Sequence, residues 1–136
     1  MLTDEERKTL VANKVRRSRE TWTETIGIIE NNYWYAAANR MYYACYYMAS
    51  ALLLKNGLSS HTHGGTISLF GLHFIKTGVV PSELGKFYSE LFELRQTGDY
   101  DDWKVVGEAD ITPLVPAAEN FLDLLEKLIR EDNYLD

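Results

Sequence analysis

Residues 37–47 read Ala-Ala-Asn-Arg-Met-Tyr-Tyr-Ala-Cys-Tyr-Tyr, and this stretch decides the fold. It lies inside a segment rich in alanine and tyrosine that predicts a helix over residues 33–55. Asn56-Gly57 follows as a stop signal, because glycine tolerates the left-handed conformation that ends many helices. Apolar side chains occupy most of the circumference of this segment, which predicts the central helix of the fold.

One face of this helix combines charge with aromatic rings. At 100° per residue, that face holds Arg40, Tyr43, Ala44 and Tyr47. An arginine buried there without a partner would cost several kcal/mol, so it needs a carboxylate, a phosphate or a subunit boundary. One interpretation is a structural ion pair with Asp99 or Asp101. The other is a guanidinium held for a phosphodiester, with tyrosines available for stacking or proton transfer.

The rest of the chain also reads as helices. Thr3 and Glu6 form a capping-box pattern that starts a helix predicted to run to about Glu30. A loop is predicted over residues 58–65, then helices over residues 66–76 and 81–96, the second ending at Thr97-Gly98. After a long loop over residues 98–111, Thr112-Pro113 starts a last helix that reaches Arg130. These elements predict an all-α antiparallel bundle of about five helices.

The composition limits the class of protein. The chain has 136 residues, 46% of them hydrophobic, and a net charge of −6, which predicts one domain over residues 1–136 with a packed core. The longest apolar run, residues 44–54, falls short of the roughly 18 residues that span a membrane, and the acidic start does not resemble a signal peptide. The one cysteine, Cys45, has no internal disulfide partner, which fits a cytoplasmic location. The chain has nine tyrosines and five phenylalanines, and composition alone does not explain this excess of tyrosine.

The negative net charge argues against broad coating of nucleic acid and leaves room only for a local basic site. The first helix carries four basic residues on the face opposite its apolar stripe: Lys14, Arg16, Arg17 and Arg19. One interpretation is a solvated surface. The other is a local phosphate-binding stripe on an acidic protein.

Common catalytic motifs are absent from the sequence, including the phosphate-binding glycine loop, Gly-x-Ser-x-Gly and His-Glu-x-x-His. His61, His63 and Cys45 have no neighbouring carboxylates in sequence, so neither a metal site nor a cofactor is expected. His73 is predicted to lie in the core or at its boundary. Cys45 has no visible base beside it and is predicted to be a small buried side chain.

Three stretches carry a family resemblance. Ala-Ala-Asn-Arg-Met-Tyr-Tyr-Ala, at residues 37–44, resembles the central helix of the HEPN domain in its UPF0332 branch. Residues 66–78, Thr-Ile-Ser-Leu-Phe-Gly-Leu-His-Phe-Ile-Lys-Thr-Gly, resemble the same family. So do residues 91–101, Leu-Phe-Glu-Leu-Arg-Gln-Thr-Gly-Asp-Tyr-Asp. The resemblance covers essentially the whole chain and agrees with the predicted order of helices.

The resemblance implies an all-α bundle that forms a homodimer, with the helices that carry Arg40 meeting near the interface. Many members are metal-independent ribonucleases with an Arg-x(4–6)-His motif, and many are encoded beside a minimal nucleotidyltransferase as the toxin of a toxin–antitoxin pair. In such a site the arginine holds the scissile phosphate. The histidine acts as general base or acid for attack by the 2′-hydroxyl.

This sequence departs from that pattern after Arg40. The positions where the family places its histidine hold Cys45, Tyr46 and Tyr47. A subgroup has Arg-x(4)-His-x-Tyr, whose tyrosine is adenylylated by the partner enzyme, and here that frame keeps Arg40 and Tyr47 but loses the histidine. Neither a thiol nor a phenol ordinarily titrates near neutral pH. The loop histidines are left as alternatives that the sequence does not place.

We therefore predict a HEPN-type protein of a toxin–antitoxin or nucleotidyltransferase system that binds RNA or a nucleotide, with any ribonuclease activity weak or lost. The residues assigned to catalysis are Arg40 and Tyr47. Those assigned to binding RNA or a nucleotide are Asn39, Tyr43, Arg95, Asp99 and Tyr100. An equal alternative makes Arg95 and Asp99 a structural pair. The alternative function is a non-enzymatic module that docks a minimal nucleotidyltransferase.

Overall fold

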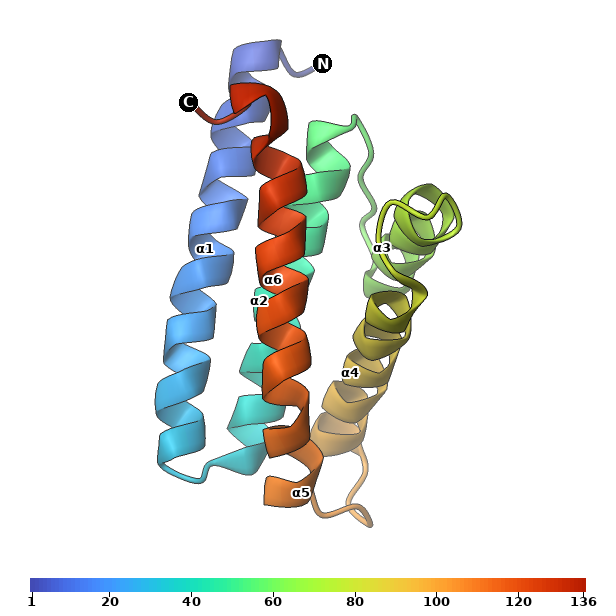
Figure 1. Cartoon of the computed structure of the whole chain (residues 1–136). Coiled ribbons are helices and arrows are strands. Elements are labelled where there is room, and N and C mark those ends of the chain that lie inside the picture. Colours follow the sequence, from blue (N-terminus) through green and yellow to red (C-terminus); the bar gives the residue numbers. More distant parts are fainter.

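The computed structural model describes residues 1–136 and is built from helices without a β-strand, which confirms the predicted all-α bundle. The elements in chain order are α1 (Asp4–Glu30), α2 (Trp34–Lys55), α3 (His63–Phe70), the π-helix η1 (Gly71–Ile75), α4 (Ser82–Tyr100), α5 (Glu108–Ile111), the 3₁₀-helix η2 (Thr112–Leu114), α6 (Val115–Arg130) and the 3₁₀-helix η3 (Glu131–Asn133). In Figure 1, the helices labelled α1, α2 and α6 run side by side, and those labelled α3 and α4 lie beside them.

The first two helices form a long antiparallel hairpin. The predicted capping box starts α1, since the Glu6 amide donates to the Thr3 hydroxyl at 3.1 Å and the Thr3 amide donates to the Glu6 carboxylate at 2.9 Å. Further along, the buried Ser18 hydroxyl donates to the Ala44 carbonyl of α2 at 2.6 Å. This bond joins the two helices near their middle, at a point where the side chains between them are small.

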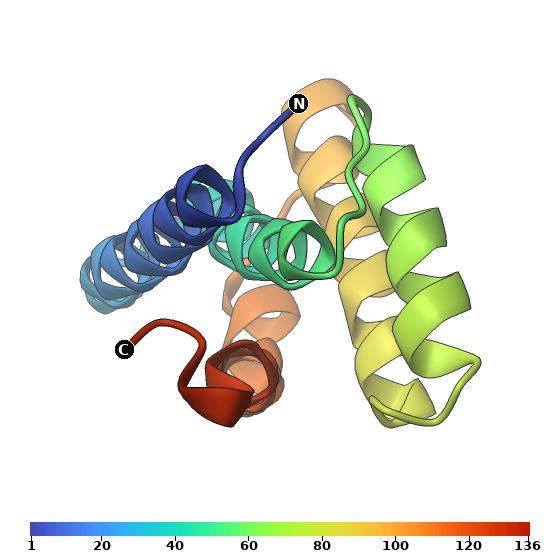
Figure 2. The same ribbon diagram turned by 90° about the horizontal axis from the view of Figure 1, so that it is seen from above.

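The central position predicted for α2 is confirmed. Seen from above in Figure 2, α2 lies in the middle, with α1 on one side, the α3–α4 pair on the other and α6 below. Its inward side chains are fully buried, among them Met41, Tyr42, Met48 and Leu52. Because neighbouring helices surround α2, a ligand can reach its polar side chains only where two of these helices leave a gap.

The predicted loop over residues 58–65 is too long. α3 begins at His63, because the Thr62 side chain caps the helix and accepts from the Gly65 amide at 2.9 Å. The helix predicted over residues 66–76 is therefore extended at its start, and its second half is the π-helix η1. His73 lies on η1 and is exposed, so its predicted place in the core or at its boundary is wrong.

α4 does not end at Thr97-Gly98 as predicted but continues to Tyr100. Gly98 lies inside the helix, where a Cβ atom would make ordinary van der Waals contacts with Tyr35 and Val106 at 3.5 Å. The loop between α4 and α5 is correspondingly shorter, over residues 101–107. The last predicted helix begins at Thr112 as η2 and continues as α6. None of the helices combines the length and the apolar character needed to cross a membrane.

Candidate functional site

Arg40 is half-buried on α2 and has no acidic partner. Its guanidinium carbon lies 5.1 Å from the centre of the Tyr43 ring, one turn along the helix. Its Nε donates a hydrogen bond to the Asn39 side chain at 3.3 Å. The structural interpretation in which Asp99 or Asp101 pairs with Arg40 is therefore wrong, because neither carboxylate forms an ion pair with it. The guanidinium keeps donors that no group in the chain occupies.

Asp99 is paired with Arg95 instead, one turn earlier on α4. The Arg95 Nε and the Asp99 carboxylate lie 3.2 Å apart without the alignment of a hydrogen bond, so the contact is an ion pair. Arg95 also donates from Nη2 to the Tyr43 hydroxyl at 3.2 Å. The Asn39 amide donates to the same Asp99 oxygen, Oδ2, at 3.5 Å. Tyr43 thus lies between two guanidinium groups that come from different helices.

Of the two loop histidines, only His63 reaches this cluster, while His61 is exposed. The His63 Nδ1 and the Tyr42 hydroxyl are 2.7 Å apart, and the His63 ring lies 4.7 Å from that of Tyr46. Burial lowers the pKa of His63, and the positive charge of Arg95 lowers it further. His63 is therefore a neutral imidazole at pH 7.

The Tyr42–His63 contact has a preferred direction. Burial raises the pKa of the Tyr42 hydroxyl well above its usual value, so the phenol keeps its proton. The hydroxyl can then donate to Nδ1, and the neutral ring carries its own hydrogen on Nε2. In this arrangement both ring nitrogens are engaged or protonated, and neither offers a free lone pair to a substrate.

The positions of the family histidine are occupied by groups of different character. Cys45 has no exposed surface, and burial raises the pKa of its thiol. Tyr46 is half-buried and packs on His63. Tyr47 lies 5.9 Å from the Tyr43 ring, which confirms that the tyrosine face follows the helical repeat.

Two of the basic residues of α1, Arg17 and Arg19, have different partners. Arg19 binds Asp123 at 2.9 Å and Glu126 at 2.6 Å on α6. Arg17 points the other way, with its guanidinium carbon 4.6 Å from the centre of the Tyr47 ring. The predicted stripe of four basic residues is therefore wrong for Arg19, which the acids of α6 neutralise, while Arg17 joins the tyrosine face of α2.

A model of the HEPN domain matches residues 14–128, which include all the side chains described above. The chain belongs to the HEPN family. Among its relatives, a UPF0332 protein of Thermotoga maritima is 44% identical over 116 residues, covering 85% of this chain and 88% of the relative.

Two further relatives come from Methanocaldococcus jannaschii. "Putative toxin MJ0605" is 33% identical over 76% of this HEPN chain and 77% of its own length. "Putative toxin MJ0142" is 26% identical over 89% of this chain and 82% of its own length. The similarity to all three relatives extends over most of both chains, so it concerns the whole bundle.

Most of the residues assigned from sequence meet in this HEPN bundle. The cluster contains Asn39, Arg40, Tyr43, Tyr47, Arg95 and Asp99. Tyr100 stands apart, since 75% of it is exposed at the end of α4. His63 was not assigned, because its place depends on how α3 docks on α2. No group of three or more histidine, cysteine or acidic side chains is arranged to hold a metal ion.

Proposed function

We propose that this HEPN protein binds the phosphate of an RNA strand or a nucleotide at Arg40, as a component of a toxin–antitoxin system. The observation that carries the proposal is the unpaired, half-buried Arg40 guanidinium held over the Tyr43 ring. An arginine without an acidic partner keeps the forked donors that bind a phosphate. The names of the two Methanocaldococcus relatives support the assignment to a toxin system.

The tyrosine face supports a ligand that has both phosphates and bases. The rings of Tyr43 and Tyr47 are 5.9 Å apart, and both side chains are half-buried. Aromatic rings beside guanidinium groups stack on unpaired bases, and such stacking tolerates different base identities. The proposed ligand is therefore single-stranded RNA or a nucleotide, with its phosphate at Arg40 and a base against a tyrosine.

We propose that cleavage by this site is weak or lost. Cleavage by attack of the 2′-hydroxyl needs a group that exchanges protons near neutral pH. Cys45 is buried with a raised thiol pKa. His63 is close to Tyr43, at 5.7 Å between ring centres, but its Nδ1 is engaged by Tyr42. Tyr47 is then a binding residue, or the acceptor of a nucleotidyl group, rather than the base of a nuclease.

Binding is tested by fluorescence anisotropy with a labelled, short single-stranded RNA and, separately, with ATP. Arg40→Gln should weaken binding about tenfold or more and lower the slope of affinity against salt by about 1 for the RNA. The matched control is Arg130→Gln, since Arg130 is 49% exposed at the end of α6 and pairs with Glu126. Equal binding by wild type and Arg40→Gln would contradict the proposal.

Cleavage is tested by incubating wild type and Arg40→Gln with total tRNA in the presence of a metal chelator. The expected result is little or no cleavage by either protein. Rapid cleavage by wild type that disappears in Arg40→Gln would still support Arg40 as the phosphate site. It would overturn the proposal that the nuclease activity is weak or lost.

A second candidate function is docking of a partner, either a minimal nucleotidyltransferase or a second copy of this chain. An exposed apolar surface at the end of the bundle favours it. Tyr33, Trp103 and Val105 are 64%, 96% and 75% exposed there, and the Tyr35 hydroxyl holds the loop by donating to the Lys104 carbonyl at 3.2 Å. Exposed apolar surfaces of this kind are typical of interaction sites.

Light scattering after gel filtration separates these alternatives. A dimer that Trp103→Ser turns into a monomer supports packing between two copies. A monomeric wild type that co-purifies with a nucleotidyltransferase, and loses it in Trp103→Ser, supports the docking module. In that case, a mass increase at Tyr47 after incubation with the partner and ATP would show that this tyrosine is its target. A wild type that is monomeric and retains no partner would contradict the docking function.

A further inference from the structure

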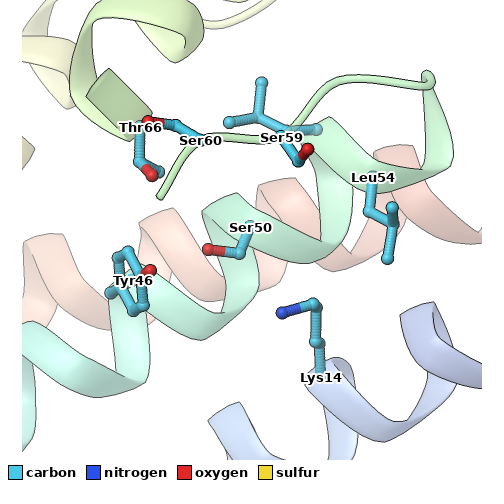
Figure 3. A pocket seen from close by; sticks show the side chains of 8 residues that line it. Lys14, Tyr46, Ser50, Leu54, Ser59, Ser60 and Thr66 are labelled. Carbon is cyan, nitrogen blue, oxygen red and sulfur yellow. The ribbon is translucent and has the colours of Figure 1, made fainter. Parts of the chain in front are cut away.

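A small pocket lies between α1, α2 and the segment that leads into α3, beside the tyrosine face but outside the Arg40 cluster. Its volume is about 70 Å³, which suits a single compact group rather than a nucleobase. Figure 3 shows the pocket from close by. One ammonium, five hydroxyls and two leucines line it: Lys14, Tyr46, Ser50, Leu53, Leu54, Ser59, Ser60 and Thr66. No carboxylate is among the lining residues.

Lys14 supplies the only charge in the pocket. Its side chain is half-buried, and it forms no ion pair, whereas Arg16 and Arg19 on the same helix both have acidic partners. In Figure 3 it extends from α1 toward Ser50 on α2. Burial lowers the pKa of Lys14, and the like charge of Arg17 lowers it further. An anion in the pocket would relieve both effects.

The hydroxyls divide into two sets. Ser60 and Thr66 are bound to the backbone around Thr62, since the Thr62 amide donates to Ser60 at 3.2 Å and Thr66 donates to the Thr62 carbonyl at 3.0 Å. These bonds hold the wall of the pocket in place. The hydroxyls of Ser50 and Ser59 form no hydrogen bond within the chain, and neither does that of Tyr46. The pocket therefore presents free hydroxyls from α2 and from the segment before α3, together with the Lys14 ammonium from α1, on a fixed frame.

We propose that this pocket binds a phosphate-type oxyanion through the Lys14 ammonium and the hydroxyls of Ser50, Ser59 and Tyr46. Charged hydrogen bonds of this kind are short and strong, and a tetrahedral anion accepts several donors at once. Leu53 and Leu54 supply the apolar part of the lining.

The pocket is adjacent to the proposed RNA site. Tyr46 lines the pocket, and its ring centre lies 6.0 Å from that of Tyr43, which carries Arg40 on its face. An RNA strand held at Arg40 and running along α2 would bring a later phosphate to the pocket at Ser50 and Lys14, and this extension rests on the proposed function. A free phosphate or the terminal phosphate of a nucleotide offers the same chemistry from a different source.

The test is an NMR titration of the ¹⁵N-labelled chain with inorganic phosphate, at constant ionic strength maintained with sodium chloride. We expect saturable shifts of the Ser59 and Ser60 amides. Lys14→Gln should weaken binding about tenfold, because it removes a charged donor. Lys86→Gln is the matched control, since Lys86 is exposed on α4 and is not among the lining residues. Ser50→Ala serves as a second variant that leaves the charge of α1 unchanged, and it should also weaken binding.

Two outcomes would overturn the proposal. One is the absence of saturable shifts in a folded wild type, and the other is equal phosphate binding by wild type, Lys14→Gln and Ser50→Ala. Arg40→Gln should bind inorganic phosphate as wild type does, so failure at Arg40 and failure of this pocket are distinguishable. Short RNA that displaces phosphate identifies the RNA backbone as the source of the anion. Displacement only by ATP identifies a nucleotide.

Discussion

Replacing Arg95 by methionine tests whether this residue supports the fold. Arg95→Met keeps most of the aliphatic stem and removes the guanidinium. Three kinds of contact are lost. They are the hydrogen bond to the Tyr43 hydroxyl at 3.2 Å, the ion pair with Asp99 at 3.2 Å, and the cation–π contacts with the rings of Tyr42 and Tyr43 at 5.6 and 5.4 Å. All three join α4 to α2 or hold the last turns of α4.

The expected loss in the free energy of unfolding follows from the type and burial of each contact. A hydrogen bond from a charged donor contributes about 1.5–3 kcal/mol, and a cation over an aromatic ring about 0.5–1 kcal/mol. The Asp99 side chain is 31% exposed, so its ion pair adds only about 0–1 kcal/mol. Methionine avoids the cost of desolvating the guanidinium, which offsets part of the loss. We expect the free energy of unfolding to fall by about 2 kcal/mol.

The measurement is urea unfolding of wild type and variant followed by far-ultraviolet circular dichroism. Lys86→Met is the matched control, because Lys86 pairs with Glu90 at 4.0 Å on the same helix but is 79% exposed. The control should change the free energy of unfolding by less than about 0.5 kcal/mol. If Arg95→Met is no more destabilising than the control, the contacts of Arg95 do not stabilise the fold.

Three further predictions concern buried groups. Ser18→Ala should lower the free energy of unfolding by about 1 kcal/mol in urea, because it removes the buried bond to the Ala44 carbonyl, and an unchanged midpoint would contradict this. The free energy of unfolding should fall as the pH drops below the ordinary histidine pKa of about 6.5, because the unfolded chain protonates His63 before the folded chain does. Urea titrations at several pH values should show that His63→Gln removes this contribution and that His61→Gln retains it. Cys45 should react with a thiol reagent only in unfolding concentrations of urea, and labelling of the native protein would contradict its burial.

Local signals were sufficient to predict most helix ends. Thr3 with Glu6 marked the start of α1, and Asn56-Gly57 marked the end of α2, because capping depends on residues close in sequence. Glycines misled the prediction twice. Gly65 follows a good cap and lies inside α3, where a Cβ atom would clash with the Ser60 hydroxyl. Gly98 lies inside α4, where a Cβ atom would make only ordinary van der Waals contacts, and the helix continues through it to Tyr100.

The candidate site was predictable along one helix and not between helices. The 100° step placed Tyr43 and Tyr47 with Arg40, as the structure confirms. The acidic partner considered for Arg40 was wrong, because Asp99 pairs with Arg95 across one turn of its own helix, α4. The approach of His63 to Tyr42 depends on the docking of α3, which no sequence spacing records.

The aromatic cluster at the junction of α2 and α3 has an optical consequence. Tyr42, Tyr43 and Tyr46 surround His63 at ring separations of 5.4, 5.7 and 4.7 Å, in fixed and asymmetric orientations. Phenol rings held in this way absorb left and right circularly polarised light unequally. Near-ultraviolet circular dichroism therefore reports the docking of α3. A rearrangement of the junction that leaves every helix intact would change the near-ultraviolet circular dichroism and leave the far-ultraviolet signal of the helices unchanged.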